Sequence, residues 1–433
     1  MRLIKTYKEP IKTLLILLLS VSAILLGLQT GLFDVPRLGD GDGTAPPLLT
    51  RSDISPAAWP TAMMANLGPD AYHGHRMDGQ TGTEPGDGLS ALYDLFSSSL
   101  GEALGSSGPG EPISVDEWEQ ALSGLGVLFR YCIEIPGGIL ARWLGTEVGG
   151  AIHGMQRIFL AIGDEAVYLY YMGFDGLPRR STTAVRPEML REHLRGLEPN
   201  GAQFGFRQAA WAGADPYAVL LPSYSGIPVI QSYNAIGAVF GQMGQIMEHF
   251  GMNLVLSRYI DEGGMRTIVQ EESTLRLLEN GLITFHCPGE NPRLTVRGDG
   301  LLDVAEAIET ARRITLALGD LAGDADIYLT EWGYEDGYFV LQFGYYLGGI
   351  PIWTEYPAAT VVIWERYVRE VTLFARNFHR SEQVSAVIPE LQAAAAVTDG
   401  ATLVLTYVAV EDAIGGQAAN MHARWLIREV QHG

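Results

Sequence analysis

The chain has 433 residues, enough for two or three domains at about 150 residues each. Apolar residues make up 47% of it and charged residues 18%, a composition that excludes disorder as the main state. The net charge of −21 lacks the basic excess with which proteins hold a phosphate backbone, so nucleic acid is not expected as a partner.

The first 33 residues predict a membrane anchor. Residues 1–12 hold every lysine of the chain and carry a net charge of +3, whereas residues 13–433 carry −24. Residues 13–33 contain no charged side chain, and as a helix they span about 31 Å, close to the thickness of a hydrocarbon core. The basic stub predicts a cytoplasmic amino terminus. We therefore expect a single-pass protein of the cell membrane, held in the lipid bilayer by one helix, with the bulk of the chain extracytoplasmic.

A cleaved signal peptide is the alternative for residues 13–33. The apolar region of a signal peptide usually covers about 7 to 15 residues and ends at a small-x-small site. Here the apolar stretch continues through Leu32 and Phe33, which favours an uncleaved transmembrane helix. Residues 34–56, rich in Gly, Pro and Asp, have the composition of a juxtamembrane linker.

A stripe of small residues runs along the expected transmembrane helix. Ala23, Gly27 and Gly31 follow one another at a spacing of one helical turn, which lets a second helix approach closely in lipid. Gln29 adds a group that can form a hydrogen bond to that helix. We predict a helix-contact site at these four residues, and the alternative is a chance pattern in a glycine-rich chain.

Residues 57–222 are predicted to form an amino-terminal α+β domain. Its expected parts are a strand at 61–67, a loop at 68–88, a helix at 89–104, a helix that ends at Leu122, a strand at 126–135, a short helix at 139–144 and paired strands at 155–162 and 166–172. Ser114 and Glu117 match a capping box. In this motif the serine hydroxyl accepts a hydrogen bond from the backbone amide three residues later, and the glutamate side chain accepts one from the backbone amide of the serine. This pair therefore predicts where the helix before Leu122 begins.

Residues 223–298 and 299–433 are predicted to form two modules, each a helix followed by a meander. The first has a helix at 235–250 and strands separated by Gly263-Gly264 and Asn280-Gly281, which are typical hairpin turns. The second has a helix from Leu302, strands at 326–332, 338–346, 350–355 and 360–374, a helix at 382–396 and a strand at 401–408. The predicted fold class is α+β: an N-terminal transmembrane helix followed by extracytoplasmic modules of antiparallel β-meanders, each packed by a helix.

The expected outer part offers little for catalysis. Because it contains no lysine, it cannot hold a Walker A loop, a Ser-x-x-Lys pair, a kinase β3 lysine or a Schiff-base nucleophile. Cys132 and Cys287 are too few for a disulfide framework and lie in apolar contexts, which favours buried thiols over a bridge between them. We predict no enzyme activity, no catalytic residue, no metal and no cofactor.

Some polar and aromatic residues leave alternatives open. His73 and His75 would point the same way from an extended segment, as zinc ligands do, but a polar loop favours solvated histidines. Paired carboxylates can serve a glycosidase, although surface acids are the favoured interpretation here. The pairs are Glu271 with Glu272, expected on opposite faces of a strand, and Glu331 with Glu335. The aromatic runs 168–171 and 345–346 could line a groove or face the core of a sheet.

Two hairpins of the chain resemble a known family. The first is Thr274-Leu275-Arg276-Leu277-Leu278-Glu279-Asn280-Gly281-Leu282-Ile283-Thr284-Phe285 with Pro288, and the second runs from Gly337-Tyr338-Phe339-Val340 through Phe343-Gly344-Tyr345-Tyr346 to Gly349-Ile350-Pro351-Ile352. Together with the layout of stub, membrane helix and acidic outer part, they resemble the YycH/YycI (WalH/WalI) family of membrane-anchored regulators. The length of the chain favours the YycH branch.

The resemblance implies a role and no active site. Members of this family regulate a Gram-positive sensor histidine kinase that oversees cell-wall metabolism, and the family has no catalytic motif to transfer. It implies that the outer domains and the membrane helix contact the kinase, and that a paralogous membrane-anchored regulator is a further partner. We therefore predict a non-enzymatic regulator of a two-component system. The alternative is an extracytoplasmic enzyme or ligand-binding module of the cell wall that uses an aromatic-lined groove.

Overall fold

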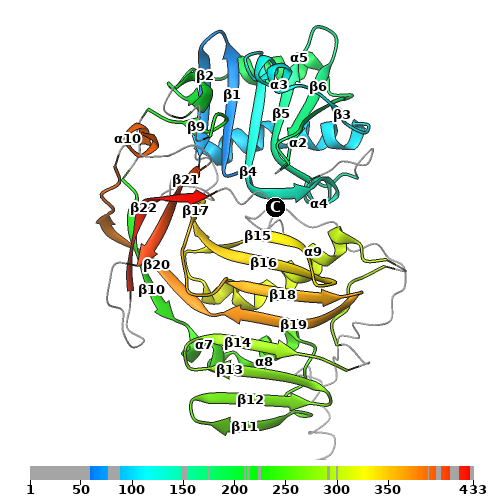
Figure 1. Ribbon diagram of the computed structural model, residues 1–433, viewed down its shortest axis with the longest axis vertical. Helices are drawn as coiled ribbons and strands as arrows, with labels where there is room; N and C mark the ends of the chain where they lie inside the picture. Colours follow the sequence, from blue (N-terminus) through cyan, green and yellow to red (C-terminus); the bar gives the residue numbers. More distant parts are fainter. Residues whose placement is uncertain are drawn as a thin grey trace, which may run out of the picture. The chain divides into compact units, whose positions relative to one another are not determined.

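Antiparallel sheets carry most of the chain that the computed structural model describes (Figure 1). The described residues are 59–76, 88–147, 154–173, 175–208, 211, 215–222, 226–289, 293–298, 301–388, 390–395, 401–409 and 419–429. The expected transmembrane helix at 13–33 and the linker at 34–56 lie outside them. No helix in these described ranges has both the length and the apolarity needed to cross a membrane.

A seven-stranded sheet is built from the first part of the described chain, in the order β2-β1-β4-β5-β6-β7-β3. Its strands are β1 (Ala62–Gly68), β2 (Ala71–Arg76), β3 (Glu111–Pro112), β4 (Gly126–Pro136), β5 (Gly154–Ile162), β6 (Val167–Met172) and β7 (Pro178–Thr182). The helices beside it are α2 (Gly88–Ser106), α3 (Val115–Leu122), α4 (Gly137–Trp143) and α5 (Pro187–Arg195).

Alternation along these strands gives the sheet two apolar faces. One face contributes Met63, Phe129 and Leu160 to a core that includes buried residues of α2, α4 and α5. The other contributes Met64 and Phe159 to a smaller core with α3 and the hairpin of β8 (Gln203–Phe204) and β9 (Val219–Leu220). Both faces of this sheet are therefore covered.

A nine-stranded sheet follows, in the order β11-β12-β13-β14-β19-β18-β16-β15, with β17 paired to β16 (Figure 1). The strands are β11 (Arg258–Glu262), β12 (Met265–Gln270), β13 (Ser273–Leu278), β14 (Leu282–His286), β15 (Asp326–Glu335), β16 (Tyr338–Leu347), β17 (Ile350–Pro351), β18 (Ala359–Trp364) and β19 (Tyr367–Phe374). Because β14 pairs with β19, this sheet combines strands from the stretches 223–298 and 299–433.

The two faces of the nine-stranded sheet differ in polarity. One register row is fully apolar and at most 1% exposed; it consists of Ile268, Leu275, Phe285, Val371, Val361 and Leu341. Helices α7 (Ile236–Gly241), α8 (Met243–His249) and α9 (Val304–Thr315) contribute buried residues to the same core. The neighbouring row is polar and consists of Thr267, Arg276, Thr284, Thr372, Thr360 and Gln342.

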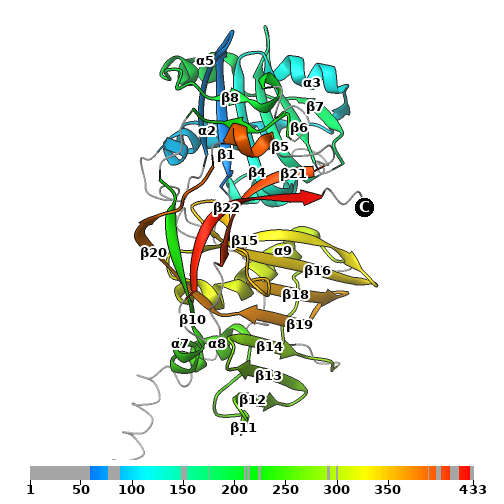
Figure 2. The same cartoon turned by 60° about the vertical axis from the view of Figure 1, so that its left-hand side comes forward.

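A four-stranded sheet, in the order β20-β10-β22-β21, completes the described chain. Its strands are β10 (Pro228–Asn234), β20 (Arg376–Val384), β21 (Ala401–Ala409) and β22 (Ala419–Glu429), and Figure 2 shows β10 between β20 and β22. The short helix α10 (Glu390–Ala394) lies between β20 and β21 in the chain. The coarse prediction of a mixed fold built on antiparallel sheets is thus confirmed.

Several local predictions are confirmed by their turn and cap chemistry. Gly263-Gly264 and Asn280-Gly281 turn the chain between β11 and β12 and between β13 and β14, with a φ of +94° at Gly281. The hydroxyl of Ser114 accepts a hydrogen bond from the amide of Glu117 at 3.1 Å. The Glu117 carboxylate, however, binds Arg180 at 2.7 Å instead of closing the capping box. The Glu117 side chain therefore pairs with Arg180 and not with the backbone amide of Ser114.

Other local predictions are wrong. The expected loop at 68–88 contains strand β2, and the expected helix at 235–250 is divided into α7 and α8 at Gln242. The expected strand at 360–374 is the hairpin of β18 and β19, whose turn places Glu365 at a φ of +55° without any glycine. The expected helix at 382–396 shrinks to α10, because β20 continues to Val384 in its pairing with β10.

Burial gives one carboxylate at the start of β15 an unusual proton affinity. Burial raises the pKa of Asp326 from 3.8 to about 6, and the charge of Arg380 lowers that pKa in part. Between these values the folded protein binds more protons than the unfolded chain, so stability falls as the pH rises through this window. Above about pH 6 the folded state carries the full free-energy cost of a buried, ionised Asp326.

We therefore expect Asp326→Asn to raise the free energy of unfolding at pH 7.5 by about 2 kcal/mol and to change it little at pH 4. Urea unfolding at both pH values measures this difference. Asp320→Asn, at an exposed position, is the matched control and should have an effect within about 0.5 kcal/mol. A gain of equal size at both pH values would contradict the titration of Asp326.

Candidate functional site

Three arginines form a row across four adjacent strands of the seven-stranded sheet. The register places Arg76 of β2 opposite Ala62 of β1, and Ala62 opposite Arg130 of β4. Arg130 in turn lies opposite Arg157 of β5. Directly opposed residues point to the same face of a sheet, so the three guanidinium groups share one face, with the small Ala62 between the first two.

A single carboxylate holds two of these arginines together. Arg130 Nη2 donates to Asp215 Oδ2 at 2.5 Å, and Arg157 Nη2 donates to Asp215 Oδ1 at 3.4 Å. Asp215 is only 5% exposed. Like charges directly opposite each other on neighbouring strands repel, and the buried carboxylate between them offsets this repulsion. Burial lowers the pKa of Arg157, and the charge of Asp215 opposes that change.

A pocket of about 260 Å³ opens in front of this row. Arg76, Arg130, Gln156 and Asp215 supply its polar wall. The aromatic and apolar wall includes Tyr131, Trp211, Tyr346, Ile350, Leu403, Leu405 and Trp425. The rings of Trp211 and Trp425 meet edge to face at 6.4 Å. The pocket therefore combines residues of the seven-stranded sheet, the four-stranded sheet and the turn after β16.

The charge of the row is opposite to that of the chain. Three arginines face one aspartate here, whereas the whole chain carries −21. Arginine presents a planar fork of donors that fits carboxylates and phosphates, and it stays protonated in proteins. The charged groups of this pocket are thus suited to bind and orient an anionic group beside aromatic rings.

The residues predicted for helix contact lie outside the described part of the chain. They are Ala23, Gly27, Gln29 and Gly31. Their role stays a prediction.

The histidine pair lies on strand β2 and not in a loop. His73 and His75 point the same way, as alternation in an extended segment predicts, and their Nε2 atoms are 3.0 Å apart. The Nδ1 atom of His73 lies 2.6 Å from the carbonyl oxygen of Glu198. Among the described residues, no group of three potential metal ligands forms around them or elsewhere. The two rings form a hydrogen-bonded pair.

The two cysteines are free thiols, so the bridge kept as an alternative is wrong. Cys287 is fully buried and accepts a hydrogen bond from Ser273 at 3.3 Å. Cys132 is partly exposed. Burial raises the pKa of its thiol to about 11, although a hydrogen bond with Tyr346 lowers that pKa in part. The Cys132 thiol is therefore protonated at neutral pH and a poor nucleophile.

The carboxylate pairs do not converge on a site. Glu271 occupies the turn between β12 and β13, at a φ of +54°, and binds Arg293 at 2.7 Å. The expectation that it leaves a strand opposite Glu272 is therefore wrong. Glu331 lies on β15 opposite Gln342, and Glu335 ends that strand at the turn.

Sequence reasoning missed the arginine row. Each of its arginines is a single basic residue at a strand position, and the row exists only through the register of four strands. Arg76 also lay in the segment predicted as a loop. The available signal was the charge itself, because Arg130 directly follows the apolar run Val127-Leu128-Phe129 and Arg157 is the one charged residue of β5.

The described part of the chain is a mixed α/β fold of antiparallel sheets with few helices. No family model matches the sequence, and no curated protein matches it significantly. Among solved structures, the chain is similar to the crystal structure of YycH from Bacillus subtilis, with a TM-score of 0.49 and 12% identity, over 85% of this chain and 96% of that chain. That structure bears the name of the family that the two hairpins resemble.

We expect Asp215→Asn to lower the free energy of unfolding by about 2 to 4 kcal/mol, because it leaves Arg130 and Arg157 opposed without a counter-charge. Urea unfolding measures the loss. Asp175→Asn is the matched control, since Asp175 binds Arg179 at 2.9 Å but is 43% exposed and should cost less than about 1 kcal/mol. Equal losses in the two variants would show that Asp215 does not bridge the row.

Proposed function

We propose that this protein is a non-enzymatic, single-pass membrane regulator that modulates a sensor histidine kinase of a two-component system in cell-wall homeostasis. It acts through its outer domains and its membrane helix. The uncharged segment 13–33, the basic stub before it and the two family-like hairpins support this role. A paralogous membrane-anchored regulator is proposed as a further partner.

One observation of the described surface carries the binding role. The arginine row beside the pocket includes Arg130 and Arg157, both bound to Asp215, and arginine neither gives nor takes protons at physiological pH. A pocket of this kind recognises a partner group and does not transform it. Exposed apolar side chains support protein contact as well, since Val255 is 77% exposed and Leu256 69%.

A second candidate function is ligand binding in the cell wall. The observation that favours it is the aromatic wall of the same pocket, where Trp211, Tyr346 and Trp425 stand beside the arginine row. Aromatic rings next to arginines suit an anionic ligand with a flat or apolar face. In this case the pocket would hold a wall component and not a segment of the kinase.

The proposed orientation has a direct chemical test. Every lysine lies in residues 1–12, so an amine-reactive reagent that cannot cross the membrane should leave the full-length protein unlabelled in intact cells. Labelling after permeabilisation is the control and should be strong. Protease added outside intact cells should degrade most of the chain. Strong labelling of the full-length chain before permeabilisation would reverse the orientation.

The kinase partnership is tested by co-purification from solubilised membranes. We expect a histidine kinase to be retained by the wild-type chain, and Gly27→Ile or Gly31→Ile to reduce its recovery because a bulky side chain separates the two helices. The cost should be on the order of 1 kcal/mol or more of association free energy.

Leu25→Ile, on another face of the same helix, is the matched control and should retain the kinase. Kinase recovery unchanged in both glycine variants would assign the contact to the outer domains alone. A wild-type chain that retains no kinase would overturn the proposed function in favour of the ligand-binding candidate.

A further inference from the structure

We propose that strand β11 is the seam of a homodimer, in which the β11 strands of two copies pair antiparallel around Ile260. Each copy would thereby extend the nine-stranded sheet of the other. This inference is independent of the kinase and of the arginine-lined pocket.

Strand β11 occupies an edge position. It ends the nine-stranded sheet and, among the described strands, pairs only with β12. All five of its residues are exposed. The opposite end of the sheet differs, because β15 contacts β4 and Trp332 donates a hydrogen bond to the carbonyl of Glu134 at 2.9 Å. An edge strand offers unpaired backbone donors and acceptors to another strand.

Strand β11 is complementary to itself in charge. Its sequence is Arg258-Tyr259-Ile260-Asp261-Glu262. In an antiparallel pair of two copies centred on Ile260, Arg258 of each copy lies opposite Glu262 of the other. Opposite charges directly across a strand pair stabilise it, and two such pairs form here.

The two charged side chains that pair across the seam in this register are not engaged in ion pairs with described residues of their own copy. Asp261 is bound within its own copy by Arg266, at 2.7 and 3.0 Å. Arg258 and Glu262 form no ion pair with any described residue. Many proteins protect an edge strand against pairing with another chain by placing charged side chains that repel an added strand or that point inward. In β11 the two unused charges have opposite signs at equal distances from the centre, which favours pairing with a second copy.

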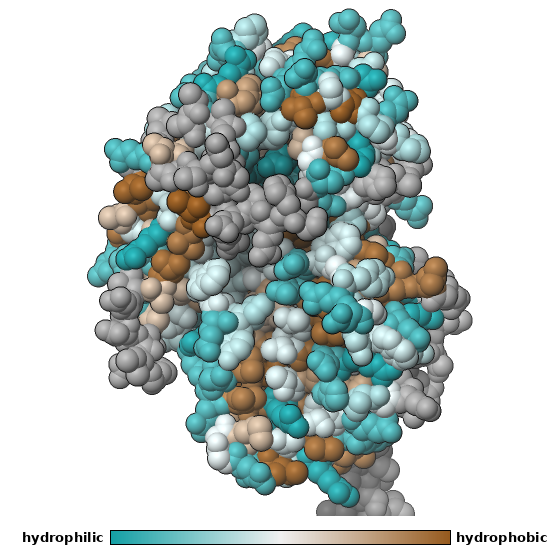
Figure 3. All heavy atoms as spheres, in the orientation of Figure 1, coloured by the Kyte–Doolittle hydropathy of each residue, from teal (hydrophilic) through white to brown (hydrophobic). Residues whose placement is uncertain are grey.

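Exposed apolar side chains lie on the strand and just before it. Ile260 lies on the polar face of the sheet, opposite Thr267, and is 47% exposed. Leu254, Val255 and Leu256 precede β11 and are 49%, 77% and 69% exposed. In the antiparallel register this loop lies beside the partner's Gly263-Gly264 turn, where no side chain interferes. Figure 3 shows hydrophobic residues among hydrophilic ones over this end of the sheet.

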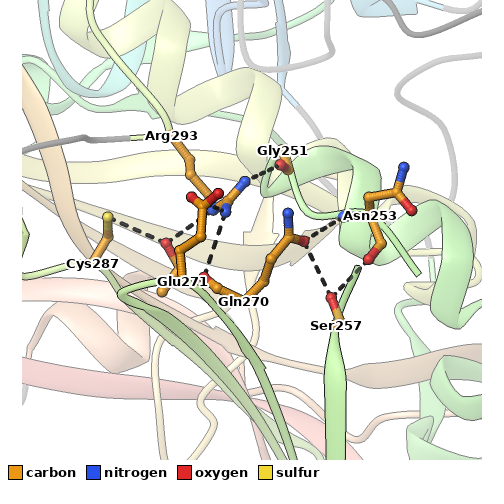
Figure 4. Close-up of polar contacts among 8 residues, drawn as sticks. Gly251, Asn253, Ser257, Gln270, Glu271, Cys287 and Arg293 are labelled. Carbon is orange, nitrogen blue, oxygen red and sulfur yellow. Dashed lines mark hydrogen bonds and ion pairs between the residues drawn. The ribbon is translucent and has the colours of Figure 1, made fainter. Parts of the chain in front are cut away.

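A polar network holds this apolar loop in place (Figure 4). Gln270 at the end of β12 accepts hydrogen bonds from the amide of Asn253 at 2.7 Å and the hydroxyl of Ser257 at 3.1 Å. The partly buried Arg293 donates to the carbonyl of Gly251 at 3.0 Å and to Glu271 at 2.7 Å. Both ends of the loop are therefore bound to the sheet. A surface fixed before association loses little conformational entropy on binding.

The test uses the full-length protein in its membrane. Ile260→Cys places two thiols across the two-fold axis, at the close approach that a disulfide needs. We expect mild oxidation to link two copies. Val384→Cys, an exposed apolar residue of the edge strand β20, is the matched control and should not be linked. Cys287 is buried and the pKa of Cys132 is raised, so the native thiols contribute little.

Charge reversal then tests the register. In the Ile260→Cys chain, Arg258→Glu or Glu262→Arg alone places like charges opposite each other and should reduce the linked fraction at least about fivefold. The double variant Arg258→Glu/Glu262→Arg restores opposite charges and should recover most of the linkage. This recovery also shows that the single variants are folded. Glu192→Arg and Arg195→Glu on α5 are control reversals that should change nothing.

Three results would overturn the proposal. The first is linkage at Ile260→Cys no greater than at Val384→Cys. The second is linkage that does not respond to the single reversals. The third is a product in which Ile260→Cys is joined to a different protein instead of a second copy, which would assign the edge to another partner's strand.

Discussion

The pairing of β14 with β19 is the constraint on which the largest sheet depends. It joins Leu282 to Phe374 and His286 to Glu370, and so brings two meanders that are distant in the chain into one register. Without it, the apolar rows of β11–β14 and of β15–β19 would end at Phe285 and Val371 and expose both edges. With it, one continuous apolar face forms beneath α7, α8 and α9, and the polar threonine row is left on the other side.

Polar contacts and a shared apolar core join the seven-stranded sheet to the nine-stranded sheet. Trp332 of β15 donates to the carbonyl of Glu134, and Arg142 of α4 lies 3.0 Å from Glu306 of α9. One apolar core extends across both sheets. The arginine-lined pocket lies where the seven-stranded sheet, the four-stranded sheet and the turn after β16 meet, so its geometry depends on how these parts are held together.

Local chemistry was readable from the sequence where a turn or cap has a characteristic residue, as at Asn280-Gly281 and Ser114. The turn at Glu365 uses a positive φ without glycine, and nothing in its composition marks it. The register between strands that are distant in the chain could not be predicted from the sequence. The alignment of Arg76, Arg130 and Arg157 depends on it, which is why the candidate site had to come from the structure.

The walls of the pocket come from both ends of the described chain, from Thr61 to Trp425. No single segment contains it, so it forms only when folding is nearly complete. Any molecule that binds there binds the native state and not the unfolded chain, and it raises the stability of every element at once, in proportion to the logarithm of its concentration. Occupancy of this pocket would therefore protect the whole described part of the chain against proteolysis, including segments far from the ligand.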